Sequence, residues 1–325
     1  MSLSLEFLER SAAETGFRVS SLEKVARLGE LAADIGRHPF LGNVLILKGG
    51  TALNLCFGPP TRLSVDLDFN YVGQAVREKM LGDRPLMETV LVELARKRQY
   101  RVQKSAEAFA GRKFYLNYRS VLGPEDRVEI DLNFIFRVPL AGIESRELWQ
   151  PGELERPVLR MVGQEELFLG KLLALLERGA ARDVWDAAHL PDKAGSRLTA
   201  DRFRKLFIAL SVVLERPLPT YSRERLERQV TEQTFTEQVV PLLNLRIDFS
   251  AHDLIDRAWE VVGRFLALSE EERAYIESAD RGDLNLELIF PDDPREAERI
   301  AGHPAIQWKM ANVREHLAKA RAKDG

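Results

Sequence analysis

The feature that most constrains the fold is a short segment in which an apolar run, a glycine pair and two aspartates follow one another closely. Residues 45–70 read LILKGGTALNLCFGPPTRLSVDLDFN. Residues 44–47 form a short apolar run, which predicts a buried strand that breaks at Gly49-Gly50. The segment TALNLCF then predicts a short helix, and SVDLDFNYV predicts a second strand. The segment therefore predicts a strand, a glycine turn, a helix and a strand.

The second strand alternates, so its polar residues share one face. Val65, Leu67 and Phe69 fall on one side, and Ser64, Asp66, Asp68 and Asn70 fall on the other. Asp66 and Asp68 therefore point the same way, about 7 Å apart along the backbone. A later strand, RVEIDLNFIF, repeats the pattern and can bring Asp131 to the same place. Three carboxylates on one sheet face predict a site for Mg²⁺ or Mn²⁺, with Asp66, Asp68 and Asp131 as the metal ligands.

The turn of Gly49, Gly50 and Thr51 predicts the other half of such a site. It opens a helix, where free backbone N–H groups and the helix dipole favour an anion, and glycine lets a phosphate approach. A single Asp-x-Asp or Gly-Gly pair is more often a solvated strand edge or an ordinary turn. Their combination indicates nucleoside triphosphate (NTP) chemistry. The chain has neither a G-x-x-x-x-G-K-[ST] nor a G-x-G-x-x-G motif.

The remaining patterns predict an α/β fold, with a nucleotidyltransferase-like mixed sheet, flanking helices and a mostly helical C-terminal domain. Residues 1–40 and 76–98 show helical periodicity, and KFYLNYRS adds a strand before RVEIDLNFIF. From Gln164 onward the chain is mostly helical. A proline-marked stretch separates the two parts. We therefore expect a domain of residues 1–150 and a helical domain of residues 151–325.

Composition limits the possible partners of the chain and its possible location in the cell. The 325 residues carry a net charge of −3, which excludes a general nucleic-acid binder of the strongly basic kind but not a local basic patch. The longest apolar run, LFIALSVVL, is far shorter than the ~20 residues of a membrane span, and we find no secretory signal. The single cysteine excludes an internal disulfide. We expect a cytoplasmic protein without a membrane partner.

Three blocks of the chain resemble one known family. KGGTALNLCFGPPTRLSVDLDF is similar to the N-terminal signature of the AbiEii/AbiGii-type toxins, a branch of the nucleotidyltransferase superfamily that includes the mycobacterial MenT toxins. EELFLGKLLALLERGAARDVWDAAHL resembles the family's lysine helix and its R-D-x-x-D segment, and residues 282–317 resemble its C-terminal end. The chain departs from the wider superfamily at Gly50, where a serine is common, so Thr51 would take over the hydroxyl contact.

The resemblance implies roles for two residues of the second block. The ammonium group of Lys171 would face the triphosphate and neutralise charge, whereas a lysine among leucines more often reaches for solvent. Asp183 would belong to the active site, either as a base or by orienting Lys171. The alternative for Asp183 is an ordinary ion pair with a nearby arginine. We expect Asp186, one turn later, to be structural.

The expected function is transfer of a nucleoside monophosphate from an NTP to a hydroxyl group. By resemblance, the acceptor would be the 3′ end of tRNA, and the chain would be the toxin of a toxin–antitoxin pair with a separately encoded antitoxin. Gly49, Gly50 and Thr51 would hold the triphosphate. Two alternatives keep the nucleotidyltransferase chemistry but use a small molecule or a protein side chain as acceptor. A third alternative is a non-catalytic module that binds NTP or RNA.

Overall fold

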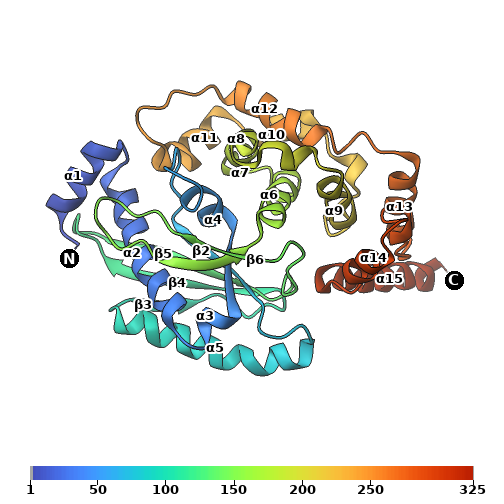
Figure 1. Cartoon of the computed structure of the whole chain (residues 1–325), viewed down its shortest axis with the longest axis horizontal. Helices are drawn as coiled ribbons and strands as arrows, with labels where there is room; N and C mark the ends of the chain where they lie inside the picture. Colours follow the sequence, from blue (N-terminus) through green and yellow to red (C-terminus); the bar gives the residue numbers. More distant parts are fainter. Residues whose placement is uncertain (1–2, 325) are drawn as a thin grey trace. The chain divides into compact units, whose positions relative to one another are not determined.

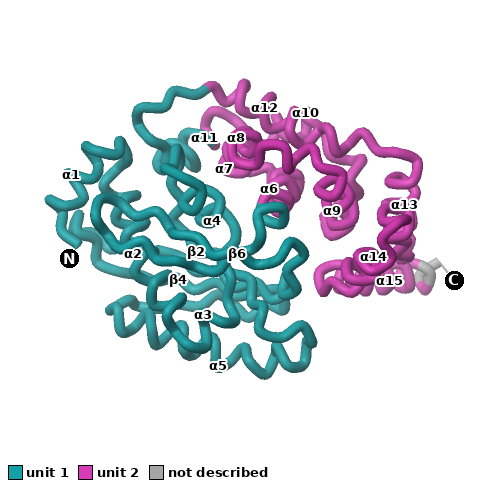
Figure 2. The backbone as a smooth tube through the Cα atoms, viewed as in Figure 1, with its two compact units in different colours: residues 1–167, 235–249 teal, residues 168–234, 250–325 magenta. Residues whose placement is uncertain are grey.

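The computed structural model describes residues 3–324, which divide into two compact units (Figure 2). The first unit consists of residues 1–167 and 235–249, and the second of residues 168–234 and 250–325. The division after residue 150 that the sequence suggests stays a prediction.

The first unit is built on one mixed sheet (Figure 1). The sheet has seven strands in the order β3-β4-β5-β2-β1-β7-β6. Its strands are β1 (Leu45–Lys48), β2 (Asp66–Tyr71), β3 (Arg101–Lys104), β4 (Gly111–Arg119), β5 (Glu125–Asn133), β6 (Ile143–Glu147) and β7 (Val158–Val162). β2 runs parallel to β5, and β1 runs parallel to β7. The other neighbouring strands are antiparallel. The two strands that carry the predicted carboxylates, β2 and β5, are therefore neighbours in the middle of the sheet.

Two of the helices of the first unit contact the apolar face of this sheet. The helices of the first unit are α1 (Leu5–Thr15), α2 (Val19–Arg37), α3 (Leu41–Val44), α4 (Gly49–Leu55) and α5 (Arg77–Lys97). The guanidinium of Arg27 in α2 lies 3.9 Å from the ring centre of Tyr118, and the hydroxyl of Tyr71 donates to Asp83 in α5 over 2.5 Å. Tyr71 and Tyr118 lie on the alternating positions that are buried in β2 and β4. Because the apolar face is covered in this way, the carboxylates of β2 and β5 are left on the other face.

A segment from late in the chain returns to the first unit. Residues 235–249 contain η3 (Val240–Leu242) and the end of α11 (Glu232–Gln238). The backbone N–H of Leu63 donates to the carbonyl of Leu242 over 2.8 Å, and the side chain of Asn244 donates to the carbonyl of Thr15 over 2.8 Å. This segment therefore ties the loop that precedes β2 to the end of α1.

The second unit is helical. Its elements are the main part of α6 (Gln164–Arg178), α7 (Ala181–Ala188), α8 (Leu190–Ala194), η1 (Gly195–Thr199), α9 (Asp201–Ser211), η2 (Leu218–Thr220), α10 (Arg223–Gln229), the beginning of α11, α12 (Ala251–Gly263), α13 (Glu270–Asp280), η4 (Leu286–Leu288), α14 (Pro294–Ala301) and α15 (Pro304–Asp324). α7 and α12 form its most extensive helix pair. The fully buried Tyr275 of α13 donates to the carbonyl of Ala209 in α9 over 2.9 Å, which joins these two helices.

The fold class expected from the sequence is confirmed: a mixed sheet with flanking helices is joined to a mostly helical second part. The four predicted strands correspond to β1, β2, β4 and β5. No sequence pattern predicted β3, β6 or β7.

Candidate active site

Two of the predicted carboxylates lie directly side by side on the sheet. Asp68 of β2 and Asp131 of β5 are register partners in the parallel pair, and Asp66 is the register partner of Glu129. Side chains of register partners share a face, and neighbouring strands are about 4.8 Å apart. The alternation of both strands therefore produces a patch of four carboxylates, which we call the carboxylate face: Asp66, Asp68, Glu129 and Asp131.

The carboxylate face is half-buried and has specific hydrogen-bond partners. The hydroxyl of Ser64, itself buried, donates to Oδ1 of Asp66 over 2.9 Å. The side chain of Asp131 is 35% exposed, and its Oδ2 lies 3.6 Å from Nζ of Lys113. The partial exposure of Asp131 leaves this end of the face accessible to a ligand.

The glycine turn approaches the carboxylate face closely. Gly49 is the first residue of α4 and has a φ of +72°, which L side chains rarely adopt. A Cβ atom at this position would lie only 2.1 Å from Oδ2 of Asp68. The sequence therefore has glycine here for two reasons, the backbone conformation and the space that the Asp68 carboxylate occupies.

Thr51 has a different place from the one expected for a phosphate ligand. Its side chain is fully buried, and its hydroxyl donates to the backbone carbonyl of Asp66. This bond ties α4 to the start of β2. The contact of the Thr51 hydroxyl with a phosphate stays a prediction, and in the structure the hydroxyl holds the strand that carries Asp66.

The donor set of the carboxylate face fits a metal ion that is shared with a substrate. Among residues 3–324, no group of three or more His, Cys, Asp or Glu side chains is arranged to hold a metal ion by itself. Mg²⁺, however, is usually bound by one or two carboxylates and completes its shell with water and substrate phosphates. Asp68 and Asp131, aligned in register beside a glycine that leaves room for the Asp68 carboxylate, supply such a partial set.

The predicted lysine lies in the second unit and forms a buried ion pair. Nζ of Lys171 in α6 donates to Oδ2 of Asp186 in α7 over 2.8 Å. The two side chains are 8% and 1% exposed. A lysine this deeply buried does not reach for solvent, so the ordinary alternative considered for Lys171 does not apply. Its ammonium is positioned by Asp186, which the sequence had led us to expect as a structural residue.

Asp183 has another partner. Its carboxylate accepts hydrogen bonds from Nε and Nη2 of Arg178 over 3.1 Å and 2.6 Å. Asp183 is buried, whereas the side chain of Arg178 is 63% exposed. The ion pair that the sequence left open for Asp183 is therefore formed. A catalytic role for Asp183 stays a prediction.

We expect Asp186→Asn to destabilise the second unit by about 2 kcal/mol, because the buried ammonium of Lys171 loses its charged acceptor. Urea unfolding of the full-length chain measures this difference. Asp192→Asn is the matched control, since Asp192 is 68% exposed and lies 3.9 Å from Arg257. Its effect should be close to zero. Equal stability of the two variants would contradict the role of Asp186.

His189 follows α7 and is held against it. Its ring stacks on Trp185 with the centres 4.5 Å apart, and its Nδ1 lies 2.8 Å from the carbonyl of Trp185. Burial lowers the pKa of His189 from its usual 6.5. The folded state therefore disfavours the protonated ring more than the unfolded state does.

This pKa shift predicts a pH-dependent stability. The contribution of His189 is fully present above the unfolded pKa of 6.5 and is lost as the pH falls through the lower folded pKa. We expect His189→Phe, which keeps an aromatic ring beside Trp185, to remove this part of the dependence. Urea unfolding between about pH 5 and about pH 8 measures it. His252→Gln, at a side chain that is 68% exposed, should keep the dependence of the unaltered protein.

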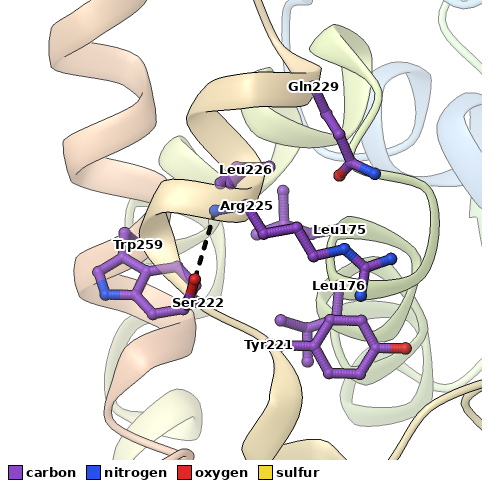
Figure 3. Close-up of a pocket in the computed structure, with 8 residues that line it drawn as sticks. All are labelled: Leu175, Leu176, Tyr221, Ser222, Arg225, Leu226, Gln229 and Trp259. Carbon is purple, nitrogen blue, oxygen red and sulfur yellow. Dashed lines mark hydrogen bonds between the residues drawn. The ribbon is translucent and has the colours of Figure 1, made fainter.

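A small cavity lies among helices of the second unit (Figure 3). Its volume is about 10 Å³, and it is lined by Leu175, Leu176, Tyr221, Ser222, Arg225, Leu226, Gln229 and Trp259. The guanidinium of Arg225 lies 4.6 Å from the ring centre of Tyr221. The bond drawn in Figure 3 is the N-cap of α10, in which Ser222 accepts from the backbone of Arg225 over 3.3 Å. A volume of about one water molecule excludes a nucleotide from this cavity.

Two lysines of the first unit belong with the carboxylate face, although the sequence analysis did not single them out. Lys48 is the register partner of Asp68, and Lys113 is the register partner of Asp131. The signal for Lys113 was its position in KFYLNY, where it alternates with the buried Phe114 and Leu116. Strand order was needed to place it beside Asp131.

No helix within the described part of the chain combines the length and the hydropathy that crossing a membrane requires.

Two comparisons with known proteins found matches. Residues 33–256 match the model of the family described as nucleotidyl transferase AbiEii toxin, type IV toxin–antitoxin system. The structure is similar to that of MenT4, a nucleotidyltransferase toxin of Mycobacterium tuberculosis, with a TM-score of 0.62 and 20% sequence identity over 92% of this chain and 98% of that one. A comparison with curated proteins found no match. The family match covers well over half of the sequence, so the chain belongs to the AbiEii family of nucleotidyltransferase toxins.

Proposed function

We propose that this nucleotidyltransferase moves a nucleoside monophosphate from an NTP to the 3′ end of a tRNA, and that a separately encoded antitoxin restrains it. The observation that carries the proposal is the alignment of Asp68 and Asp131 beside Gly49. Carboxylates in this arrangement, with a backbone that a phosphate can approach, suit the chemistry of a triphosphate. The tRNA acceptor and the antitoxin rest on the family.

The carboxylates would bind the metal ion, and the glycine turn would bind the phosphates. Asp66 and Asp68 would hold Mg²⁺ or Mn²⁺, with Asp131 as a further ligand or as the base that takes the proton of the acceptor hydroxyl. The metal would supply charge neutralisation and activation of the hydroxyl group. Gly49 and Gly50 would present backbone N–H groups to the phosphates. Thr51 would keep Asp66 in position through its bond to the Asp66 carbonyl.

A role for Lys171 in the reaction rests on the family resemblance. The ammonium of Lys171, positioned by Asp186, would stabilise negative charge as the bond to the α-phosphate breaks. By the same resemblance Asp183 would act as a base, and its carboxylate accepts hydrogen bonds from Arg178. In this proposal Lys171 is a binding and catalytic residue, Asp183 a catalytic residue, and Asp186 the positioning residue of Lys171.

Nucleotide transfer tests the proposal directly. Purified protein is incubated with total tRNA, Mg²⁺ and each labelled NTP in turn, beside Asp66→Ala. Label on tRNA with the unaltered protein alone would support the reaction and identify the nucleotide. Metal-dependent NTP binding without labelled RNA would reject the tRNA acceptor and leave a small molecule or a protein. Absence of NTP binding would reject the proposed chemistry.

A further inference from the structure

Four charged residues form a straight row across the sheet. The order is Lys48 on β1, Asp68 on β2, Asp131 on β5 and Lys113 on β4, and each is the register partner of the next. Register partners point to the same face, so the row places two carboxylates between two ammonium groups. Like charges side by side on neighbouring strands are destabilising, and opposite charges at both ends offset that cost.

Lys113 is the end of this row that is free to move. Its Nζ lies 3.6 Å from Oδ2 of Asp131, which is longer than a good hydrogen bond, and its side chain is 49% exposed. Lysine is a compact charge on a flexible stem, so the ammonium can leave Asp131 without a change in the backbone. Another carboxylate of the face, Glu129, lies 3.2 Å from Arg127 and does not need Lys113.

We propose that Lys113 is a built-in counter-cation of the carboxylate face, which makes the site favour a metal–nucleoside triphosphate complex over the free metal ion. This inference rests on the proposed metal site. In the protein without substrate, the ammonium of Lys113 lies next to Asp131 and neutralises its charge. The attraction of Asp131 for a metal ion is therefore reduced. A free divalent cation must displace a positive charge and then remain beside it.

Lys113 has the opposite effect on the metal–nucleotide complex. A magnesium triphosphate complex carries net negative charge, so the displaced ammonium is attracted to its phosphate oxygens instead of being repelled. The same lysine therefore weakens binding of the metal alone and strengthens binding of the complex. Lys113 would thus disfavour metal binding to the carboxylates before the nucleotide binds.

Mn²⁺ binding to the full-length protein tests this inference without any activity measurement. The loss of the free Mn²⁺ signal in electron paramagnetic resonance is titrated for the unaltered protein, Lys113→Met and Lys113→Arg. Lys79→Met, at an exposed lysine of α5, is the matched control. The titrations are repeated with a non-hydrolysable NTP analogue.

We expect Lys113→Met to bind Mn²⁺ alone about fivefold more tightly, and the Mn²⁺–nucleotide complex about fivefold more weakly, than the unaltered protein. Lys113→Arg and Lys79→Met should match the unaltered protein in both titrations. Equal affinity of Lys113→Met and the unaltered protein for Mn²⁺ alone would overturn the inference and leave the metal site standing. Mn²⁺ binding that is absent, or that Asp68→Asn does not weaken, would overturn the metal site and the inference together.

Discussion

Asp68→Asn is expected to lower nucleotide transfer by at least about 10³-fold. Asp68 is the carboxylate at the centre of the site: it is the register partner of both Lys48 and Asp131, and Gly49 lies against it. The amide keeps the shape of the side chain but loses the charge that a metal ligand requires. Transfer of labelled nucleotide under saturating NTP and metal measures the effect.

The fold should tolerate Asp68→Asn. A loss of transfer activity would then reflect the reaction and not a loss of stability. The substitution removes one of two like charges that face each other across β2 and β5, so the thermal midpoint should move by only a few degrees. Glu125→Gln is the control, because Glu125 lies at the far end of β5, is 66% exposed and pairs with Arg101 over 3.0 Å. It should keep full transfer activity. Comparable losses in both variants would show that Asp68 acts through the sheet and not at the reaction.

The strands that the sequence predicted are those with one buried face. β2 and β5 alternate between buried apolar and half-exposed polar residues, and this period identified them. β3 and β6 were missed because they are the two edges of the sheet, where almost no residue is buried. β7 was missed because five residues of a mostly apolar run do not distinguish a strand from a helix.

The site was predictable in its residue types but not in its pairings. Alternation placed Asp66, Asp68 and Asp131 on polar faces, yet the register that aligns Asp68 with Asp131 depends on the order of strands far apart in the sequence. Lys113 could not be placed for the same reason. Local spacing carries no information about which strand becomes the neighbour.

For the helices, too, the sequence did not predict which residues pair, as the ion pair of Lys171 shows. Asp183 and Asp186 are three residues apart, so both lie within one turn of α7 and either could reach a partner on α6. Packing assigns Asp186 to Lys171 and Asp183 to Arg178. The family resemblance pointed to Asp183 and passed over the residue that holds the ammonium.

The second large effect is expected for Gly49→Ala. At a φ of +72°, alanine is strained, and its Cβ would lie 2.1 Å from Oδ2 of Asp68. Either the carboxylate or the turn must move. We expect the free energy of unfolding to fall by about 3 kcal/mol. Transfer should fall by at least about 10²-fold, since displacing a catalytic group by 1 Å is enough for such a loss.

Gly58→Ala separates the effect of backbone strain from the effect of the steric clash with Asp68. Gly58 has a φ of +83°, but a Cβ there would meet no atom within 4 Å. This variant should lose about 1 kcal/mol of stability from the backbone alone and keep its transfer activity. The difference between the two variants then measures what the Asp68 carboxylate contributes by its position. If both variants lose activity equally, backbone strain explains the effect. If only Gly49→Ala loses activity, the carboxylate must stay where glycine leaves room for it.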